Sequence, residues 1–141
     1  MTQAMTGNCI CGATTITATP EREAMDACHC SICRQWSAGP YLAFGCENIE
    51  IAEGSPIGVY QSSPWAERVF CKECGTSLVW RTRDGKHNHV SSQIFPDAAA
   101  YALTSQIFID EKPTGYDFAN ETQIMTGAEV FAMFAPSEGE K

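Results

Sequence analysis

The sequence predicts one mainly β domain with few short helices. The chain has 141 residues, of which 44% are apolar, and this is enough to build a hydrophobic core. Short runs of β-branched and aromatic residues alternate with turn-rich stretches, a pattern that favours strands over helices. No linker rich in Pro, Gly or Ser divides the chain. We therefore predict a single domain over residues 1–141.

Strands are expected wherever β-branched or aromatic residues cluster between turns. The first is residues 10–19, with four β-branched residues in succession before Pro20 stops the strand. The later strands are expected at residues 41–44, 49–51, 58–60, 68–70, 77–82, 89–92 and 106–109. Two short helical segments are expected at residues 96–103, which are rich in alanine, and at residues 129–134.

Seven of the eight cysteines lie in three closely spaced groups. The groups are Cys9-Ile10-Cys11, then Cys28-His29-Cys30-Ser31-Ile32-Cys33, then Cys71-Lys72-Glu73-Cys74, which Gly75 follows. Residues two apart in an extended segment point to the same face, and residues three apart can meet through a turn. Glycine after the last cysteine tolerates a positive φ, as the tight turn of a zinc knuckle requires. This spacing indicates metal sites rather than disulfides or isolated buried thiols.

The number of ligands in each group indicates what each site can do. Two pairs supply four thiolates, which make a closed tetrahedral zinc site, whereas a triplet leaves one coordination position for a substrate. Zn²⁺ with three thiolates carries a net charge of −1, so it should activate water weakly. A soft thiol suits the open position better, and it would lose its proton there and become a sulfur nucleophile.

Charge and targeting features limit the classes of partner. The formal net charge is −8, and the nine Lys and Arg residues are scattered without a basic stripe, so we expect no nucleic-acid partner. We find no signal-peptide pattern at the N-terminus and no apolar run of membrane-spanning length, so we expect no membrane association. The expected location is the cytoplasm, where reduced thiols favour metal binding.

Two long motifs resemble the glutathione-dependent formaldehyde-activating enzyme family, which includes centromere protein V. They are Cys28-His29-Cys30-Ser31-Ile32-Cys33-Arg34 and Phe70-Cys71-Lys72-Glu73-Cys74-Gly75-Thr76-Ser77-Leu78, with Gly7-Asn8-Cys9-Ile10-Cys11-Gly12 before them. The resemblance covers about residues 7–116 and implies a β-tent fold, in which small antiparallel sheets are organised around zinc.

The resemblance also implies two zinc ions with different roles. Cys9, Cys11, Cys71 and Cys74 would hold a structural zinc, and Cys28, Cys30 and Cys33 a labile catalytic one. The family's named reaction joins formaldehyde to the thiol glutathione, giving S-hydroxymethylglutathione, and the reverse reaction is that of a carbon–sulfur lyase. This agrees with the preference for thiols inferred from the charge of the site.

The sequence departs from the family pattern at two places. Gln106 stands where many relatives carry His, and Thr114-Gly115 replaces an aromatic residue that often follows the Lys-Pro step. Either change could reshape the substrate pocket. The alternative to a lyase-like enzyme is a non-catalytic, zinc-stabilised module that binds a protein. Short exposed strands would also allow a homodimer.

Six other residues are candidates for the site or its surroundings. Arg34 could clamp a substrate carboxylate or be an ordinary surface residue, and Trp36 could line the cleft for a thiol substrate. His29 should point away from the metal if its segment is extended. His87 and His89 favour a solvated strand edge over a metal pair. Isolated Cys46 is expected to be a small buried residue.

Overall fold

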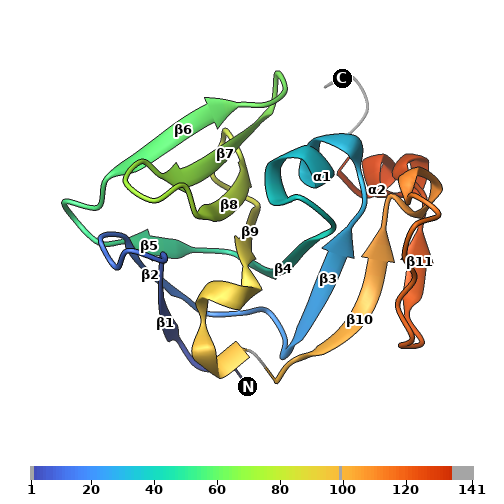
Figure 1. Ribbon diagram of the computed structural model, residues 1–141, viewed down its shortest axis with the longest axis horizontal. Helices are drawn as coiled ribbons and strands as arrows, with labels where there is room; N and C mark the ends of the chain where they lie inside the picture. Colours follow the sequence, from blue (N-terminus) through green and yellow to red (C-terminus); the bar gives the residue numbers. More distant parts are fainter. Residues whose placement is uncertain (1, 99, 135–141) are drawn as a thin grey trace. The chain divides into compact units, whose positions relative to one another are not determined.

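The computed structural model describes residues 2–98 and 100–134 (Figure 1). Within these residues the chain forms eleven strands, two α-helices and three short 3-10 helices, so the predicted mainly β class is confirmed. The chain divides into two compact units, each made of two separate stretches. The first unit comprises Met1–Met25 and Leu42–Ala102, and the second comprises Asp26–Tyr41 and Leu103–Lys141.

A small antiparallel sheet opens the first unit. Its strand order is β1 (Met5–Asn8), β2 (Thr15–Ala18) and β5 (Ile49–Ile51). Side chains alternate between buried and more exposed positions along β1 and β2, as period-two geometry requires, and Ile16 is fully buried. Gly7 is required by packing, because a Cβ there would lie 2.6 Å from the Ile94 carbonyl oxygen.

A longer run of antiparallel strands completes the first unit. Its order is β4 (Tyr41–Cys46), β9 (Asn88–Ser91), β8 (Ser77–Thr82), β7 (Ala66–Cys71) and β6 (Ile57–Gln61). Val69 pairs with Val79, and Val79 pairs with Val90, so three valines form a row across adjacent strands. All three are fully buried. Two 3-10 helices, η1 (Ser92–Ile94) and η2 (Pro96–Ala98), follow β9.

The second unit combines three strands with both α-helices. Figure 1 shows β3 (Ala24–Cys28), β10 (Ala102–Ile107) and β11 (Gln123–Met125) side by side. β11 pairs in parallel with β10, unlike the antiparallel pairs of the first unit. The helices are α1 (Ser31–Ser37) and α2 (Gly127–Phe134).

A short 3-10 helix, η3 (Ile109–Glu111), links two helix starts in the second unit. Asp110 accepts a hydrogen bond from the Gly127 N–H at the start of α2, with a length of 2.8 Å. Glu111 accepts one from the Ser31 N–H at the start of α1, with a length of 2.9 Å. The preceding Phe108 has φ 54°, which is uncommon for a bulky side chain. Consecutive carboxylates therefore satisfy unpaired N–H groups of two helices.

Most predicted strands and the last helix are confirmed. Strands lie at or across the predicted residues 41–44, 49–51, 58–60, 68–70, 77–82 and 89–92, and α2 includes residues 129–134. None of the helices in residues 2–98 and 100–134 combines the length and apolar character needed to cross a bilayer.

Three other predicted elements are confirmed only in part. Residues 10–14 form a turn, and only Thr15–Ala18 is a strand, because the cysteine pair interrupts the extended chain. The predicted helix at 96–103 shrinks to η2 before β10 begins at Ala102. The strand predicted at 106–109 ends at Ile107, because Phe108 turns into η3.

The sequence did not predict β1, β3, β11 or α1. The expectation that His87 and His89 lie at a solvated strand edge was wrong for His89, which lies in β9. This strand, which contains His89, pairs with β4 on one side and β8 on the other.

Candidate metal centres

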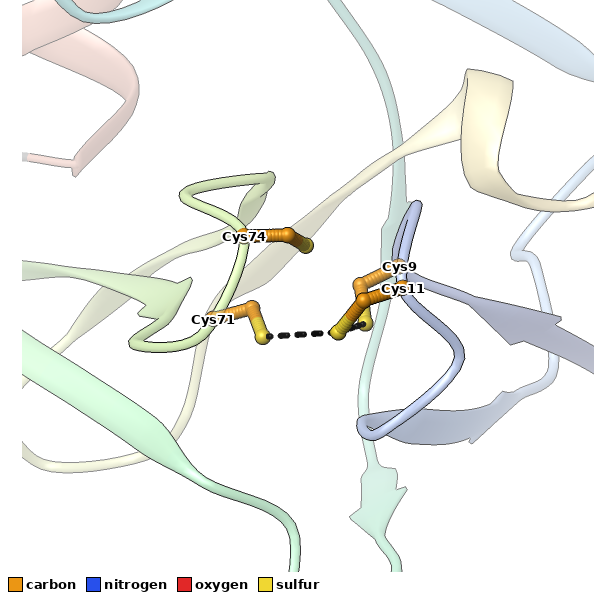
Figure 2. A group of neighbouring side chains, drawn as sticks. All are labelled: Cys9, Cys11, Cys71 and Cys74. Carbon is orange, nitrogen blue, oxygen red and sulfur yellow. Dashed lines mark hydrogen bonds between the residues drawn. The ribbon is translucent and has the colours of Figure 1, made fainter.

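Four cysteines from two turns of the first unit converge and are called the four-cysteine group. Cys9 and Cys11 follow β1, Cys71 ends β7, and Cys74 lies in the turn before β8. Figure 2 shows the two pairs pointing toward each other, and all four sulfur atoms lie within 4.8 Å of one another.

The sulfur spacing fits a tetrahedral zinc ion. Cys9 Sγ lies 3.6 Å from Cys11 Sγ, and Cys11 Sγ lies 3.9 Å from Cys71 Sγ. Four thiolates at a Zn–S distance of about 2.3 Å would lie about 3.8 Å apart. The donors are therefore suited to zinc without rearrangement of the chain.

Glycines with left-handed backbone make both turns possible. Gly12 and Gly75 each have φ 82°. Each donates its N–H to the carbonyl of the first cysteine of its pair, Gly12 to Cys9 at 3.1 Å and Gly75 to Cys71 at 2.8 Å. The positive φ predicted for Gly75 is confirmed, and it reverses the chain so that both cysteines of the pair face one point. In addition, the Thr14 N–H donates to Cys9 Sγ at 3.2 Å.

Thr76 stabilises a thiolate in the four-cysteine group. Its hydroxyl accepts a hydrogen bond from the Ile10 N–H at 3.1 Å, so its own proton is free to point at Cys74 Sγ, also 3.1 Å away. The Thr76 hydroxyl, together with N–H groups of the backbone, lowers the pKa of Cys74 to about 5. The sequence analysis quoted Thr76 in a motif but gave it no role. A hydroxyl two residues after a ligand cysteine was the available signal.

Cys28, Cys30 and Cys33 form a second set in the second unit, called the three-cysteine group. Their sulfur atoms also lie within 4.8 Å of one another. Cys28 ends β3, Cys30 is the N-cap residue of α1, and Cys33 lies in its first turn. Cys30 Sγ accepts a hydrogen bond from the Cys33 N–H at 3.3 Å. The expected turn between these two cysteines is therefore the first turn of a helix.

The three-cysteine group has three donors where the other group has four. Among the described residues, no fourth His, Cys, Asp or Glu ligand atom belongs to this cluster. Cys28 is 9% exposed and Cys33 is 3% exposed, whereas Cys30 is more accessible. The neighbouring thiols of Cys30 and Cys33, and then burial, raise the pKa of Cys28. Thiols this close resist ionising together, so a soft divalent cation fits the donor set.

His29 lies between two cysteines of the group but is engaged elsewhere. It is fully buried, and its Nδ1 lies 2.9 Å from the Tyr116 hydroxyl. Its Nε2 lies 2.8 Å from Gln106 Oε1, and Gln106 Nε2 donates to Thr122 Oγ1 at 2.8 Å. Both ring nitrogens therefore have side-chain partners outside the three-cysteine group, and His29 does not belong to that cluster of possible ligands. Burial, assisted by the charges of Lys112 and Arg34, lowers the pKa of His29, so the imidazole is neutral.

Gln106 and Tyr116 were not assigned these contacts from the sequence. Gln106 was noted only as a departure from the family pattern, and it is 7% exposed and bonded at both ends of its amide. Tyr116 directly follows the Thr114-Gly115 departure, so an aromatic residue is present just after the two positions that depart from the pattern. That shifted aromatic was the signal available in the sequence.

Two other candidate residues, Arg34 and Trp36, lie on α1, the helix whose first turn contains Cys33. The Arg34 Nε donates to the His29 carbonyl at 2.9 Å, which holds the guanidinium against the cysteine loop. The Trp36 ring lies 5.1 Å from the Tyr41 ring, between centroids.

The remaining candidates lie in the first unit. Cys46 is 2% exposed, as predicted, and burial raises its pKa to about 12. The His89 ring packs against Trp80, with 5.4 Å between centroids. Neither His87 nor His89 belongs to a cluster of possible metal ligands among the described residues.

Comparisons with known proteins were made for sequence and for structure. The family described as glutathione-dependent formaldehyde-activating enzyme matches residues 4–111. An uncharacterized lyase of Schizosaccharomyces pombe is 39% identical over 126 residues, covering 88% of this chain and 92% of the lyase. A crystal structure of a Rhodobacter sphaeroides protein matches with a TM-score of 0.58 and 23% identity. It covers 71% of this chain and all of the other, and supports the fold alone.

Proposed function

Because this chain belongs to the glutathione-dependent formaldehyde-activating enzyme family, we propose that it is a zinc-dependent carbon–sulfur lyase acting on a thiol adduct. The adduct would be S-hydroxymethylglutathione or a close relative. The observation that carries the proposal is the three-cysteine group, whose three donors and single accessible cysteine suit a metal that accepts one exchangeable ligand.

The two cysteine groups would bind zinc ions with different roles. Cys9, Cys11, Cys71 and Cys74 would hold a structural zinc, because four thiolates close the coordination sphere. Cys28, Cys30 and Cys33 would hold a second, labile zinc. When bound there, that ion would offer an open position at which a substrate thiol loses its proton.

The reaction is an addition of sulfur to a carbonyl. The thiolate sulfur attacks the carbon of formaldehyde, a C–S bond forms, and the carbonyl π pair becomes a lone pair on oxygen, which takes a proton. The reverse step removes that proton, breaks the C–S bond and returns thiolate and formaldehyde. The site's part is to keep the sulfur ionised and to hold the small carbonyl beside it.

Arg34 and Trp36 are proposed to bind the rest of the thiol. Glutathione carries two carboxylates, and a guanidinium can hold a carboxylate through two parallel N–H groups. The Arg34 Nε is held by the His29 carbonyl, which fixes the guanidinium on the cysteine loop. Trp36 would provide an apolar wall beside the loop. The reduced state of all eight cysteines suits a reducing compartment such as the cytoplasm.

The reaction is tested by measuring exchange between formaldehyde and glutathione by NMR, with and without the zinc-loaded protein. We expect acceleration by the native protein and its loss in Cys28→Ser, with one zinc lost per chain. Cys46→Ala is the matched control, because it removes a buried thiol outside both groups. No acceleration by a protein holding two zinc ions would contradict the reaction. A single zinc that Cys28→Ser leaves in place would favour the non-catalytic binding module.

A further inference from the structure

Strand β6 (Ile57–Gln61) is the outer strand of the longer run of antiparallel strands in the first unit. Among the described strands, only β7 pairs with it (Figure 1). Proteins commonly protect such an edge with a charge, a proline or a bulge, because another extended chain can pair with it. β6 contains no charged residue and no proline, and it pairs with β7 without a shift in register. Its edge is therefore left open to a further strand.

The pairing with β7 determines which backbone groups of β6 face the open side. Just before the strand, the Lys72 N–H donates to the Pro56 carbonyl at 2.7 Å. Just after it, the Ser62 N–H donates to the Ala66 carbonyl at 3.1 Å. Hydrogen-bonded pairs of an antiparallel ladder recur at every second residue, so the even-numbered residues of β6 bond to β7. The N–H and C=O groups of Val59, at the centre of the strand, therefore point to the open side.

The charges near this edge favour a second copy of the chain as its partner. The protein has a net charge of −8, so two copies repel each other over much of their surfaces. Residues 54–66, which contain β6 and the turns at its two ends, include no charged residue. Glu67, which follows them, is paired with Arg81 at 2.7 Å. Two copies therefore meet no like charges along this edge, and a strongly charged partner would find no opposite charge on it.

The side chains on one face of β6 are complementary to themselves about a two-fold axis. Gly58 and Tyr60 project to the same face, and Tyr60 is 65% exposed. The Phe70 ring fills the space beside Gly58, where a Cβ would lie 2.4 Å from it. When two copies of β6 pair antiparallel about Val59, Gly58 of each copy lies opposite Tyr60 of the other. Each Tyr60 ring then covers an edge glycine and packs on the Phe70 ring beside it.

We propose that β6 pairs with β6 of a second copy, antiparallel and centred on Val59, so that the chain forms a homodimer. The Val59 N–H of each copy donates to the Val59 carbonyl of the other, and the Gln61 N–H donates to the Ile57 carbonyl. The Ile57 N–H already donates to the Ser55 carbonyl at 2.9 Å and adds no bond. This inference does not depend on the proposed reaction.

The expected dimer is weak. A contact between two five-residue strands falls in the small class of interfaces, below about 1,200 Å². We therefore expect a dissociation constant of about 10–100 μM. Sedimentation equilibrium of the zinc-loaded protein, over a range of concentrations that spans this value, measures it.

The interface is tested with Val59→Lys, which places two ammonium groups next to each other on the two-fold axis. Val59 is 49% exposed, so the variant should fold as the native protein does, and thermal unfolding followed by circular dichroism checks this. We expect the dissociation constant to rise at least about tenfold, because like charges directly opposite each other destabilise strand pairing. Ile124→Lys is the matched control, since Ile124 is 60% exposed on β11, an outer strand of the second unit. It should leave self-association unchanged.

The register is tested by isotope-filtered NMR on a mixture of labelled and unlabelled protein. Pairing about Val59 makes Gly58 and Tyr60 of the other copy a non-hydrogen-bonded pair, with Cα atoms about 4.5 Å apart. Within one extended strand the same two residues lie about 6.6 Å apart. We expect a contact between their Hα atoms that arises only between copies. Tyr60→Ala should weaken the dimer about tenfold, and Tyr60→Phe should preserve it, because the ring makes the contact.

Three outcomes would overturn the proposal. A native protein that stays monomeric up to about 1 mM would leave this edge to an extended segment of another protein. A dimer that Val59→Lys leaves intact would show that the copies meet elsewhere. A dimer that lacks the contact between Gly58 and Tyr60 would show that the strands pair in another register.

Discussion

The four-cysteine and three-cysteine groups use the same donor atom but are built by different backbone structures. The four-cysteine group brings together two turns that are separated by 60 residues between Cys11 and Cys71. The three-cysteine group lies within a single stretch, from the end of β3 to the first turn of α1. A metal in the first would join distant parts of the chain, whereas a metal in the second would bind a locally formed loop.

The two groups also differ in the side chains that surround them. The four-cysteine group lies against the core of the first unit, where Cys9 and Cys71 are members of the main hydrophobic cluster. The three-cysteine group is bordered by polar and charged side chains, including His29, Arg34 and Glu111. Each group has two buried cysteines and at least one that is more accessible, so the groups differ in their surroundings rather than in burial. The buried cysteines of the four-cysteine group belong to the core, whereas the three-cysteine group has polar and charged neighbours.

The largest expected effect is that of removing a ligand from the four-cysteine group. Cys71→Ser should abolish cooperative unfolding of the protein and reduce its zinc content. Structural zinc contributes about 10–16 kcal/mol in small zinc domains, as much as the roughly 5–15 kcal/mol stability of a typical domain. Thermal unfolding followed by circular dichroism, with metal analysis, measures both effects.

Cys46→Ala provides the matched control for this experiment. It also removes a fully buried thiol of the first unit, but one that belongs to neither group. We expect it to lower the free energy of unfolding by about 1 kcal/mol, as for removal of a small buried atom group. Equal stability losses in the two variants would contradict a structural metal in the four-cysteine group.

The second expected effect, smaller than the loss of folding, is a difference between the two cysteine groups in the rate of zinc release. We expect a chelator to remove one zinc quickly and the other slowly, because a three-thiolate site is open to an attacking ligand and a closed site is not. The far-ultraviolet circular dichroism should be retained after the first release and lost after the second. Absorbance of the chelator complex follows both phases.

Two experiments assign the two phases of zinc release to the two cysteine groups. Cys28→Ser should lack the fast phase and keep the slow one. Glutathione should compete with the chelator in the fast phase only. Release of both ions in a single phase would remove the distinction between the groups.

The grouping of the cysteines could be predicted because the information for it is local. Ligand spacing, the glycine after Cys74 and the count of thiols are all visible in a few residues of sequence. Strands rich in β-branched residues, such as β8, were found for the same reason. By contrast, β3 has the sequence Ala-Met-Asp-Ala-Cys, with no β-branched residue, and it forms because neighbouring strands pair with it.

The structure around the three-cysteine group could not be predicted in this way. Helix α1 has only seven residues, too few to display an apolar repeat, and its N-cap is a cysteine rather than a usual capping residue. His29 meets partners 77 and 87 residues away, Gln106 and Tyr116. No pattern within the segment containing His29 encodes those contacts. The grouping of the cysteines was therefore predictable from the sequence, and the surroundings of the three-cysteine group were not.

The smallest expected effect concerns how the three-cysteine group is held. Glu111 accepts the Ser31 N–H at the start of α1, next to the N-cap Cys30. Glu111→Gln removes a negative charge from the positive end of that helix and should lower the free energy of unfolding by about 0.5–1 kcal/mol. Because Cys30 and Cys33 are fixed by the same helix turn, the fast phase of zinc release should accelerate while the slow phase stays unchanged.

This variant tests whether the two groups are independent of each other. Glu121→Gln is the matched control, since it removes the same charge from an exposed position in the same unit. If Glu111→Gln also accelerated the slow phase, the four-cysteine group would depend on α1, and the separation of roles would fail. If only the fast phase responds, η3 is a local support for the three-cysteine group. The geometry of the loop that carries Cys28, Cys30 and Cys33 would then depend on the Glu111 carboxylate, which lies 80 residues from Ser31 in the sequence.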